Sequence, residues 1–282
     1  MKKIAFILAL LTCCAVLFSC GEPEGREIFD ADGNAVATGY YDGDVLLYEE
    51  VLDSNEDLSK RTTYDDEGRV EMVEDYTLGK KYSESVYSYT EDAGNYSVSE
   101  TVFNNKGVVV SVTETKYEGD RAVTKTRTSS TTGEAHDVQV SDFVYNEDGT
   151  VLEKISSNGT DVREVLTDGN GVLLTDREFN NNGASTKTFY EAGKVVTKIE
   201  NFNDNGELVV TVVNEYDENG VHTGSKSYNA AGELKDYSEY VYNGSKLVAI
   251  YKYYANGSIH STITYDEEGK ATIHTGKYVY VG

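Results

Sequence analysis

The chain has 282 residues, of which 49 are Asp or Glu and 25 are Lys or Arg, and its formal net charge at pH 7 is −24. A surface this acidic repels nucleic acid phosphates and anionic lipid headgroups, so the composition argues against both as partners. The cysteines, Cys13, Cys14 and Cys20, all precede residue 21, so we expect neither a disulfide nor thiolate chemistry in the rest of the chain.

The first twenty residues have the three-part layout of an export signal. Residues 2 and 3 are lysines, residues 4–18 form an apolar run, and the segment closes on Leu17-Phe18-Ser19-Cys20. The run is shorter than the roughly 20 residues that a permanent membrane-spanning helix needs. Its ending resembles the lipobox of bacterial lipoproteins, which implies a signal peptide over residues 1–19 and acyl chains on Cys20. An ordinary secretory signal and an uncleaved anchor are the alternatives.

A short tether is expected after the lipidated cysteine, so that the two together occupy residues 20–27. Residues 21–27 read Gly-Glu-Pro-Glu-Gly-Arg-Glu and carry no strand pattern. Acyl chains contribute about 0.8 kcal/mol per buried methylene and would attach the protein to a membrane through Cys20. Glu22 stands where lipoproteins retained at the inner membrane carry Asp. The resemblance therefore implies the outer membrane of a Gram-negative bacterium, at its periplasmic face or at the cell surface.

Turn signals recur through residues 28–282, which we interpret as one repeat domain. In each unit an aromatic residue precedes Asp- or Asn-rich positions and a glycine. Asp and Asn at the start of a turn hydrogen-bond their own backbone, and glycine adopts the positive φ that closes a type I turn with a bulge. The units are Phe29-Asp-Ala-Asp-Gly33, Tyr64-Asp-Asp-Glu-Gly68, Phe103-Asn-Asn-Lys-Gly107, Tyr145-Asn-Glu-Asp-Gly149, Phe179-Asn-Asn-Asn-Gly183, Phe202-Asn-Asp-Asn-Gly206, Tyr216-Asp-Glu-Asn-Gly220, Tyr228-Asn-Ala-Ala-Gly232 and Tyr265-Asp-Glu-Glu-Gly269.

The spacing of these turns predicts an all-β protein. Turn glycines in the second half recur about every dozen residues, which leaves about 7 or 8 for each strand. The segments between them are rich in Val, Thr, Tyr and Ile, but large aliphatic residues are too few for a thick core. We therefore expect a repetitive antiparallel β-meander of many short hairpins, largely one layer thick and curved or solenoid-like, held by cross-strand pairs.

One segment of the repeat domain has a different composition. The Thr- and Ser-rich stretch at 124–133 is either an irregular loop, marking a seam between two halves near residues 124–136, or a polar strand.

Two repeat families share the turn pattern. Residues 64–70, Tyr-Asp-Asp-Glu-Gly-Arg-Val, resemble the tyrosine–aspartate repeat of Rhs-type proteins. Residues 253–259, Tyr-Tyr-Ala-Asn-Gly-Ser-Ile, followed by a further turn at 265–270, resemble the MORN-variant repeats of antitoxin-like proteins. The resemblance touches most of residues 29–282 and implies hairpins without catalytic residues. Rhs-type chains are far longer and enclose a toxin, so that function is not carried over.

Candidate catalytic and metal-binding residues are few. The four histidines, at positions 136, 222, 260 and 274, lack the close spacing of zinc ligands, and no nucleophile or phosphate-binding motif occurs. Asn201, Asn203 and Asn205 imitate the start of an EF-hand loop, but Val212 stands where a bidentate Glu is required. We therefore predict a non-enzymatic protein that has no metal site and no cofactor.

The 23 tyrosines are the remaining candidates for a binding surface. Tyrosine offers a large contact area at low entropic cost and is favoured at recognition surfaces. The alternative is that the tyrosines only pack within the repeat. The candidate surface comprises Tyr240, Tyr242, Tyr251, Tyr253 and Tyr254.

These observations favour a membrane-anchored lipoprotein whose repeat surface binds a protein or glycan in the cell envelope or at the cell surface. A second hypothesis, which comes from the MORN-variant resemblance, is an immunity or antitoxin-like protein that neutralises a toxin. A third is a structural component of the envelope.

Overall fold

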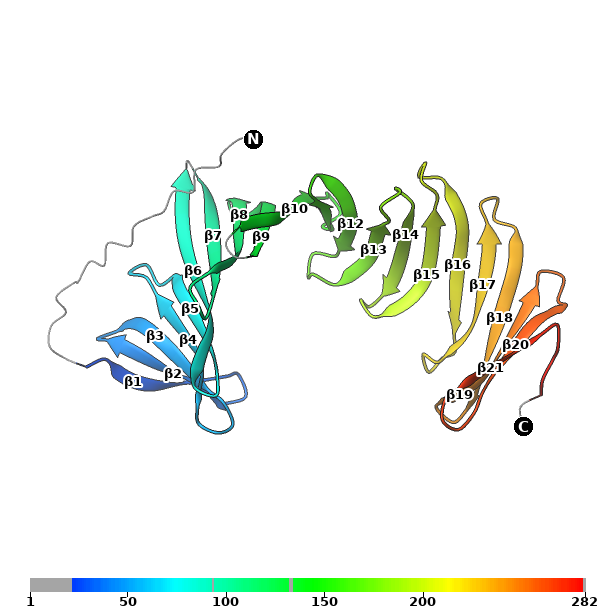
Figure 1. Cartoon of the computed structure of the whole chain (residues 1–282), viewed down its shortest axis with the longest axis horizontal. Coiled ribbons are helices and arrows are strands. Elements are labelled where there is room, and N and C mark those ends of the chain that lie inside the picture. The colour runs from blue at the N-terminus through cyan, green and yellow to red at the C-terminus, as the bar shows by residue number, and fades with distance from the viewer. Residues whose placement is uncertain (1–21, 93, 132–133, 281–282) are drawn as a thin grey trace. The chain divides into compact units, whose positions relative to one another are not determined.

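The structure is a computed structural model that describes residues 22–92, 94–131 and 134–280. These residues form 21 strands of one antiparallel sheet and contain no helix (Figure 1). The predicted signal peptide and the predicted lipid-bearing Cys20 lie outside the described residues. Within the described part of the chain, no helix has the length and apolarity needed to cross a membrane.

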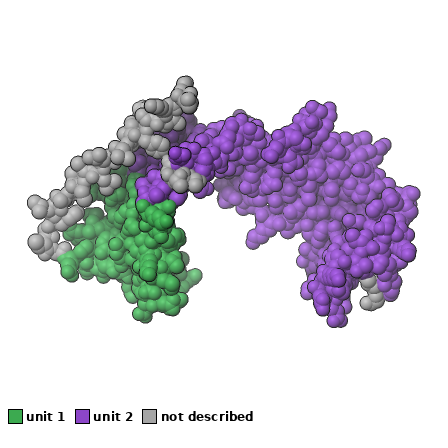
Figure 2. Space-filling view, viewed as in Figure 1, with its two compact units in different colours: residues 1–87, 104–106 green, residues 88–103, 107–282 purple. Residues whose placement is uncertain are grey.

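The chain divides into two compact units, residues 1–87 with 104–106 and residues 88–103 with 107–282 (Figure 2). The first unit contains a meander in which each strand pairs with the next. Its strands are β1 (Glu24–Phe29), β2 (Ala35–Asp42), β3 (Val45–Leu52), β4 (Leu58–Tyr64), β5 (Val70–Thr77) and the first part of β6 (Lys80–Asp92).

The second unit continues the same order of pairing from β7 to β21. After the end of β6 its strands are β7 (Asn95–Asn104), β8 (Val109–Glu118), β9 (Arg121–Thr131), β10 (Glu134–Tyr145), β11 (Val151–Ser157), β12 (Thr160–Thr167), β13 (Leu173–Phe179), β14 (Ser185–Glu191), β15 (Val195–Phe202), β16 (Leu208–Tyr216), β17 (His222–Asn229), β18 (Leu234–Asn243), β19 (Lys246–Tyr254), β20 (Ile259–Tyr265) and β21 (Ala271–Thr275). The predicted all-β antiparallel meander is confirmed.

The sheet is one layer thick, and few apolar side chains are therefore buried in it. Among the described residues, the buried apolar side chains are Ala249 and Tyr251 alone. Cross-strand contacts take the place of a core. In the first unit Arg61 bonds Glu50 at 2.5 Å, and in the second the guanidinium of Arg177 lies 4.8 Å from the ring centres of both Phe179 and Phe202.

The turns have the geometry that their residues predict. Gly171 has a φ of 80° and donates its N–H to the carbonyl oxygen of Asp168 at 3.0 Å, as in a type I turn closed by a glycine bulge. The Asp168 side chain accepts the N–H groups of Asn170 at 2.8 Å and Val172 at 2.9 Å. The glycines that close the nine repeat units all have positive φ, so their predicted role is confirmed.

The Asp168 turn is expected to make stability depend on pH. The N–H groups of Val172, and next those of Asn170, lower the pKa of Asp168 below its ordinary value of 3.8. Its stabilising effect is therefore complete above that value and is lost as pH falls through the lowered pKa. Asp168→Asn keeps an acceptor oxygen, as Asn203 and Asn229 do in equivalent turns. As pH is lowered from about 5 to about 2, we expect the melting temperature of Asp168→Asn, measured by circular dichroism, to fall less than that of wild type. If the melting temperatures of Asp168→Asn and wild type fell equally with pH, the pKa of Asp168 would not contribute to the pH dependence of stability.

The predicted tether was wrong from Glu24 onward, because β1 begins at this residue rather than after residue 27. The strand forms through contacts that the local sequence does not reveal. Gly25 pairs with Tyr40, and the Arg26 guanidinium lies 4.8 Å from the ring centre of Tyr41. Arg26 also donates to the carbonyl oxygen of Gly43 at 3.1 Å. A strand with little apolar content is thus held by its tyrosine-rich neighbour.

The Thr- and Ser-rich stretch is a strand through Thr131 rather than an irregular loop. Residues 124–131 belong to β9 and pair with β8 on one side and with β10 on the other. Residues 132 and 133 lie outside the described part. The division into compact units falls within β6, between Tyr87 and Ser88, and not near residues 124–136.

Candidate functional site

The register of β18, β19 and β20 decides which candidate tyrosines share a face. Directly paired residues of antiparallel strands lie on the same face, and successive residues alternate. The Tyr251 face, as we call it, carries the pairs Tyr237–Tyr253 and Glu239–Tyr251. The Lys252 face carries the other alternating pairs, namely Asp236–Tyr254, Ser238–Lys252 and Tyr240–Ile250.

The five candidate tyrosines therefore do not form one surface. Tyr251 and Tyr253 lie on one face, and Tyr240 and Tyr254 on the other. Tyr242 follows the register shift between Val241 and Tyr242, near the end of β18. Burial is the main cause that raises the pKa of Tyr242 above its ordinary value.

Three of these tyrosines are occupied by intramolecular contacts. Tyr251 is 4% exposed, stacks on Tyr278 at 4.5 Å and donates its hydroxyl to the carbonyl oxygen of Val279 at 2.9 Å. Tyr240 contacts the ring of His222 at 4.5 Å. Tyr253 stacks on Tyr237 at 4.7 Å, and burial, followed by the charge of Glu239, raises its pKa to about 12. Packing thus accounts for these rings.

Tyr254 is different, because this residue is 50% exposed and borders a cavity. The rings of Tyr254 and His260 make a T-shaped contact, with ring centres 5.0 Å apart and an interplanar angle of 82°. The cavity has a volume of about 300 Å³, and its lining consists of Asp236, Ser238, Lys252, Tyr253, Tyr254 and His260. Two of the candidate tyrosines therefore border a hollow that also has an acid, an ammonium, a hydroxyl and an imidazole.

Sequence reasoning missed Asp236, Ser238, Lys252 and His260. The signal lies in the alternation of polar residues on either side of Gly244, which places residues 236 and 238 opposite residues 254 and 252. Reading it requires the register, which depends on the Gly244-Ser245 turn and on the shift between Val241 and Tyr242. His260 joins the group through a second shift, where Tyr253 pairs with Ile259.

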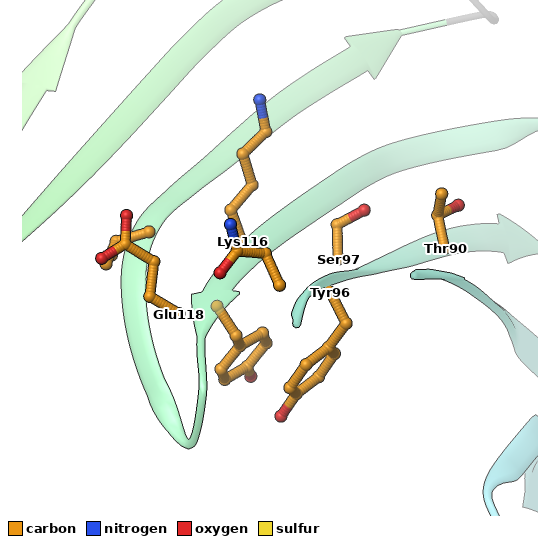
Figure 3. Close-up of a pocket in the computed structure, with 8 residues that line it drawn as sticks. Thr90, Tyr96, Ser97, Lys116 and Glu118 are labelled. Carbon is orange, nitrogen blue, oxygen red and sulfur yellow. The ribbon is translucent and has the colours of Figure 1, made fainter. Parts of the chain in front are cut away.

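A second cavity of about 300 Å³ lies at the ends of β7 and β8. Figure 3 shows Thr90, Ser97 and Lys116 on one side of the ribbon and Tyr96 on the other. The register agrees, because Ser97 pairs with Lys116 whereas Tyr96 pairs with Tyr117, its stacking partner at 4.4 Å. No aromatic residue that lines this cavity shares the face of its polar groups, whereas Tyr254 shares a face with Asp236 and Lys252, so this cavity is the weaker candidate.

The described residues contain no group of three or more His, Cys, Asp or Glu side chains arranged to hold a metal ion. The asparagines that imitate an EF-hand loop have structural contacts. Asn201 accepts a hydrogen bond from Thr186 at 2.8 Å, and Asn203 accepts the N–H groups of Asn205 and Glu207 at 3.0 and 2.9 Å. A turn accounts for this segment.

Comparison with known proteins adds little to this description. No family model and no curated protein matches the chain. One similar solved structure is a chain of the TcdB2-TccC3-Cdc42 complex, with 12% identity over 89% of this chain and a TM-score of 0.14. The present chain spans 20% of the length of that chain. Another is a porin-like protein from Bacteroides uniformis, with 10% identity, coverage of 89% of this chain and 96% of that protein, and a TM-score of 0.21. Neither likeness carries an argument about function.

Proposed function

We propose that the chain is a non-enzymatic lipoprotein, anchored through Cys20 to the outer membrane, whose β-repeat surface binds a glycan or a protein. The observation that carries the proposal is the single-layer sheet, in which both faces present side chains to solvent and few apolar side chains are buried. Because strand pairing satisfies the backbone, the exposed aromatic and charged side chains of such a sheet are available for recognition. The export signal and the repeat resemblance support the same proposal.

The anchor and the binding surface are tested separately. Metabolic labelling with a radioactive fatty acid should label the full chain and leave Cys20→Ser unlabelled. The full chain, purified in detergent, is then applied to a glycan array and used as bait with an envelope extract. A chain that takes up no fatty acid contradicts the anchor, and one that retains no glycan or protein contradicts the binding role.

An antitoxin-like role is the second candidate, since a net charge of −24 suits a basic partner. It predicts that the same bait captures one basic toxin in a complex that weakens steeply with added salt. A captured partner whose binding does not change with ionic strength would contradict it.

A further inference from the structure

Asp236 and Lys252 carry opposite charges on the same face but form no ion pair with each other. They are diagonal neighbours, because Asp236 lies opposite Tyr254 and Ser238 lies opposite Lys252. Within residues 22–92, 94–131 and 134–280, neither side chain has an ion pair or a hydrogen bond. Elsewhere in the sheet such charges pair across strands, as Arg163 does with Asp176 at 2.6 Å. The carboxylate and the ammonium at this cavity are therefore available to a ligand.

Tyr254 adds an aromatic platform beside these groups. The residue is 50% exposed, and its backbone N–H donates to the carbonyl oxygen of Ser258 at 2.9 Å in the turn that follows β19. His260 makes a T-shaped contact with this ring, and Nδ1 of the histidine lies 3.1 Å from the hydroxyl oxygen of Ser261. The ring of Tyr254 thus borders the cavity beside His260, and the Nε2 atom of His260 has no partner among the described residues.

This combination matches the chemistry of a sugar ring. A pyranose has an apolar face of C–H groups that stacks on an aromatic ring, and hydroxyls around its rim that both donate and accept hydrogen bonds. In the cavity the carboxylate of Asp236 accepts, the ammonium of Lys252 donates, and the hydroxyl of Ser238 does either. The volume of about 300 Å³ lies at the lower end of the range for ligand pockets and suits one monosaccharide unit.

The charge balance favours a neutral sugar. The charges of Asp236 and Lys252 sum to zero at the cavity. The chain as a whole carries a net charge of −24 and repels anionic ligands. An amino acid zwitterion would depend on ion pairs with the exposed Asp236 and the half-buried Lys252, of which the first contributes little, and it would leave the ring of Tyr254 uncovered. We propose that the cavity formed by β18, β19 and β20 binds a neutral pyranose unit of a glycan. This inference rests on the proposed binding function and names its ligand class and site.

The test uses the full chain in detergent and an array of neutral oligosaccharides that end in glucose, galactose, mannose or N-acetylglucosamine. Glycans that are retained are then titrated in solution. Tyr254→Ala and Asp236→Asn should each weaken binding by about tenfold, because they remove the stacking platform and the charged acceptor. Tyr254→Phe keeps the ring and should weaken binding less than Tyr254→Ala does. Tyr82→Ala is the matched control, since this tyrosine is also 50% exposed but lies in β6, and its binding should equal that of wild type.

The outcomes separate this inference from the proposed function. Glycan or protein binding that Tyr254→Ala and Asp236→Asn leave unchanged overturns the site and leaves the binding role standing. Free amino acids or peptides that bind in a manner sensitive to both substitutions overturn the ligand class. A full chain that binds neither glycans nor envelope proteins overturns both proposals. Circular dichroism spectra identical to wild type exclude unfolding as the cause of lost binding.

Discussion

Gly224→Ala is expected to destabilise the second unit, although alanine in the interior of a strand is normally more stabilising than glycine. A Cβ at position 224 would lie 2.5 Å from the backbone carbonyl oxygen of Ser238 on the neighbouring strand. Since that atom belongs to the paired backbone of β18, the strands must separate or the pairing must distort. Overpacking of this kind costs about 1–3 kcal/mol. Urea unfolding followed by circular dichroism should show a lower midpoint for the variant.

Gly25→Ala is the matched control, because Gly25 is also a strand glycine whose φ is not positive. The nearest atom to a Cβ there is Cγ2 of Thr38 at 3.5 Å, an ordinary contact. Alanine at this position should leave the midpoint unchanged or raise it, since alanine is favoured over glycine in a strand by about 0.5–1 kcal/mol. If Gly224→Ala and Gly25→Ala shifted stability in the same direction, the close approach of β17 and β18 would not be the reason for glycine at position 224.

The repeat could be predicted from the sequence because its turns depend on local chemistry. An Asp or Asn that accepts backbone N–H groups, followed by a glycine with positive φ, defines a turn without reference to the rest of the molecule. The turn after β3 shows the limit of this reasoning. Glu56 replaces the glycine there with a φ of 65°, while Asp53 still accepts the N–H groups of Asn55 and Asp57. A pattern that requires glycine passes over this turn.

The candidate site could be predicted only in part, because the sharing of a face depends on register. Tyr253 and Tyr254 were expected to border a ligand and do border a cavity, but their neighbours Asp236 and Lys252 are brought together by pairing between strands. One register shift changes which side chains face together. The sequence shows which residues share a face within each strand. The pairing of strands shows which residues of neighbouring strands lie on that same face.

The largest loss of stability is expected from Tyr251→Ala. This side chain is one of two buried apolar residues among those described, and it joins β19 to the segment that follows β21. Its ring stacks on Tyr278, and the hydroxyl of Thr262 beside it donates to the carbonyl oxygen of Lys277 at 2.7 Å. Truncating a buried aromatic residue costs about 3–5 kcal/mol, and here it also removes the surface that holds Lys277 and Tyr278. We expect a lower unfolding midpoint and faster tryptic cleavage after Lys277, detected as a mass loss corresponding to residues 278–282.

Two further variants in β19 separate the contribution of the Tyr251 hydroxyl from that of its ring. Tyr251→Phe keeps the stacked ring but loses the hydrogen bond to Val279, so it should cost about 1 kcal/mol and slightly increase cleavage after Lys277. Tyr254→Ala removes an exposed ring from the same strand and should leave cleavage at the wild-type rate. Equal cleavage rates in Tyr251→Ala and wild type would mean that Tyr251 does not hold the C-terminal segment. The predicted order follows from burial, since a ring that excludes water on both of its faces stabilises the sheet far more than one that remains half exposed to solvent.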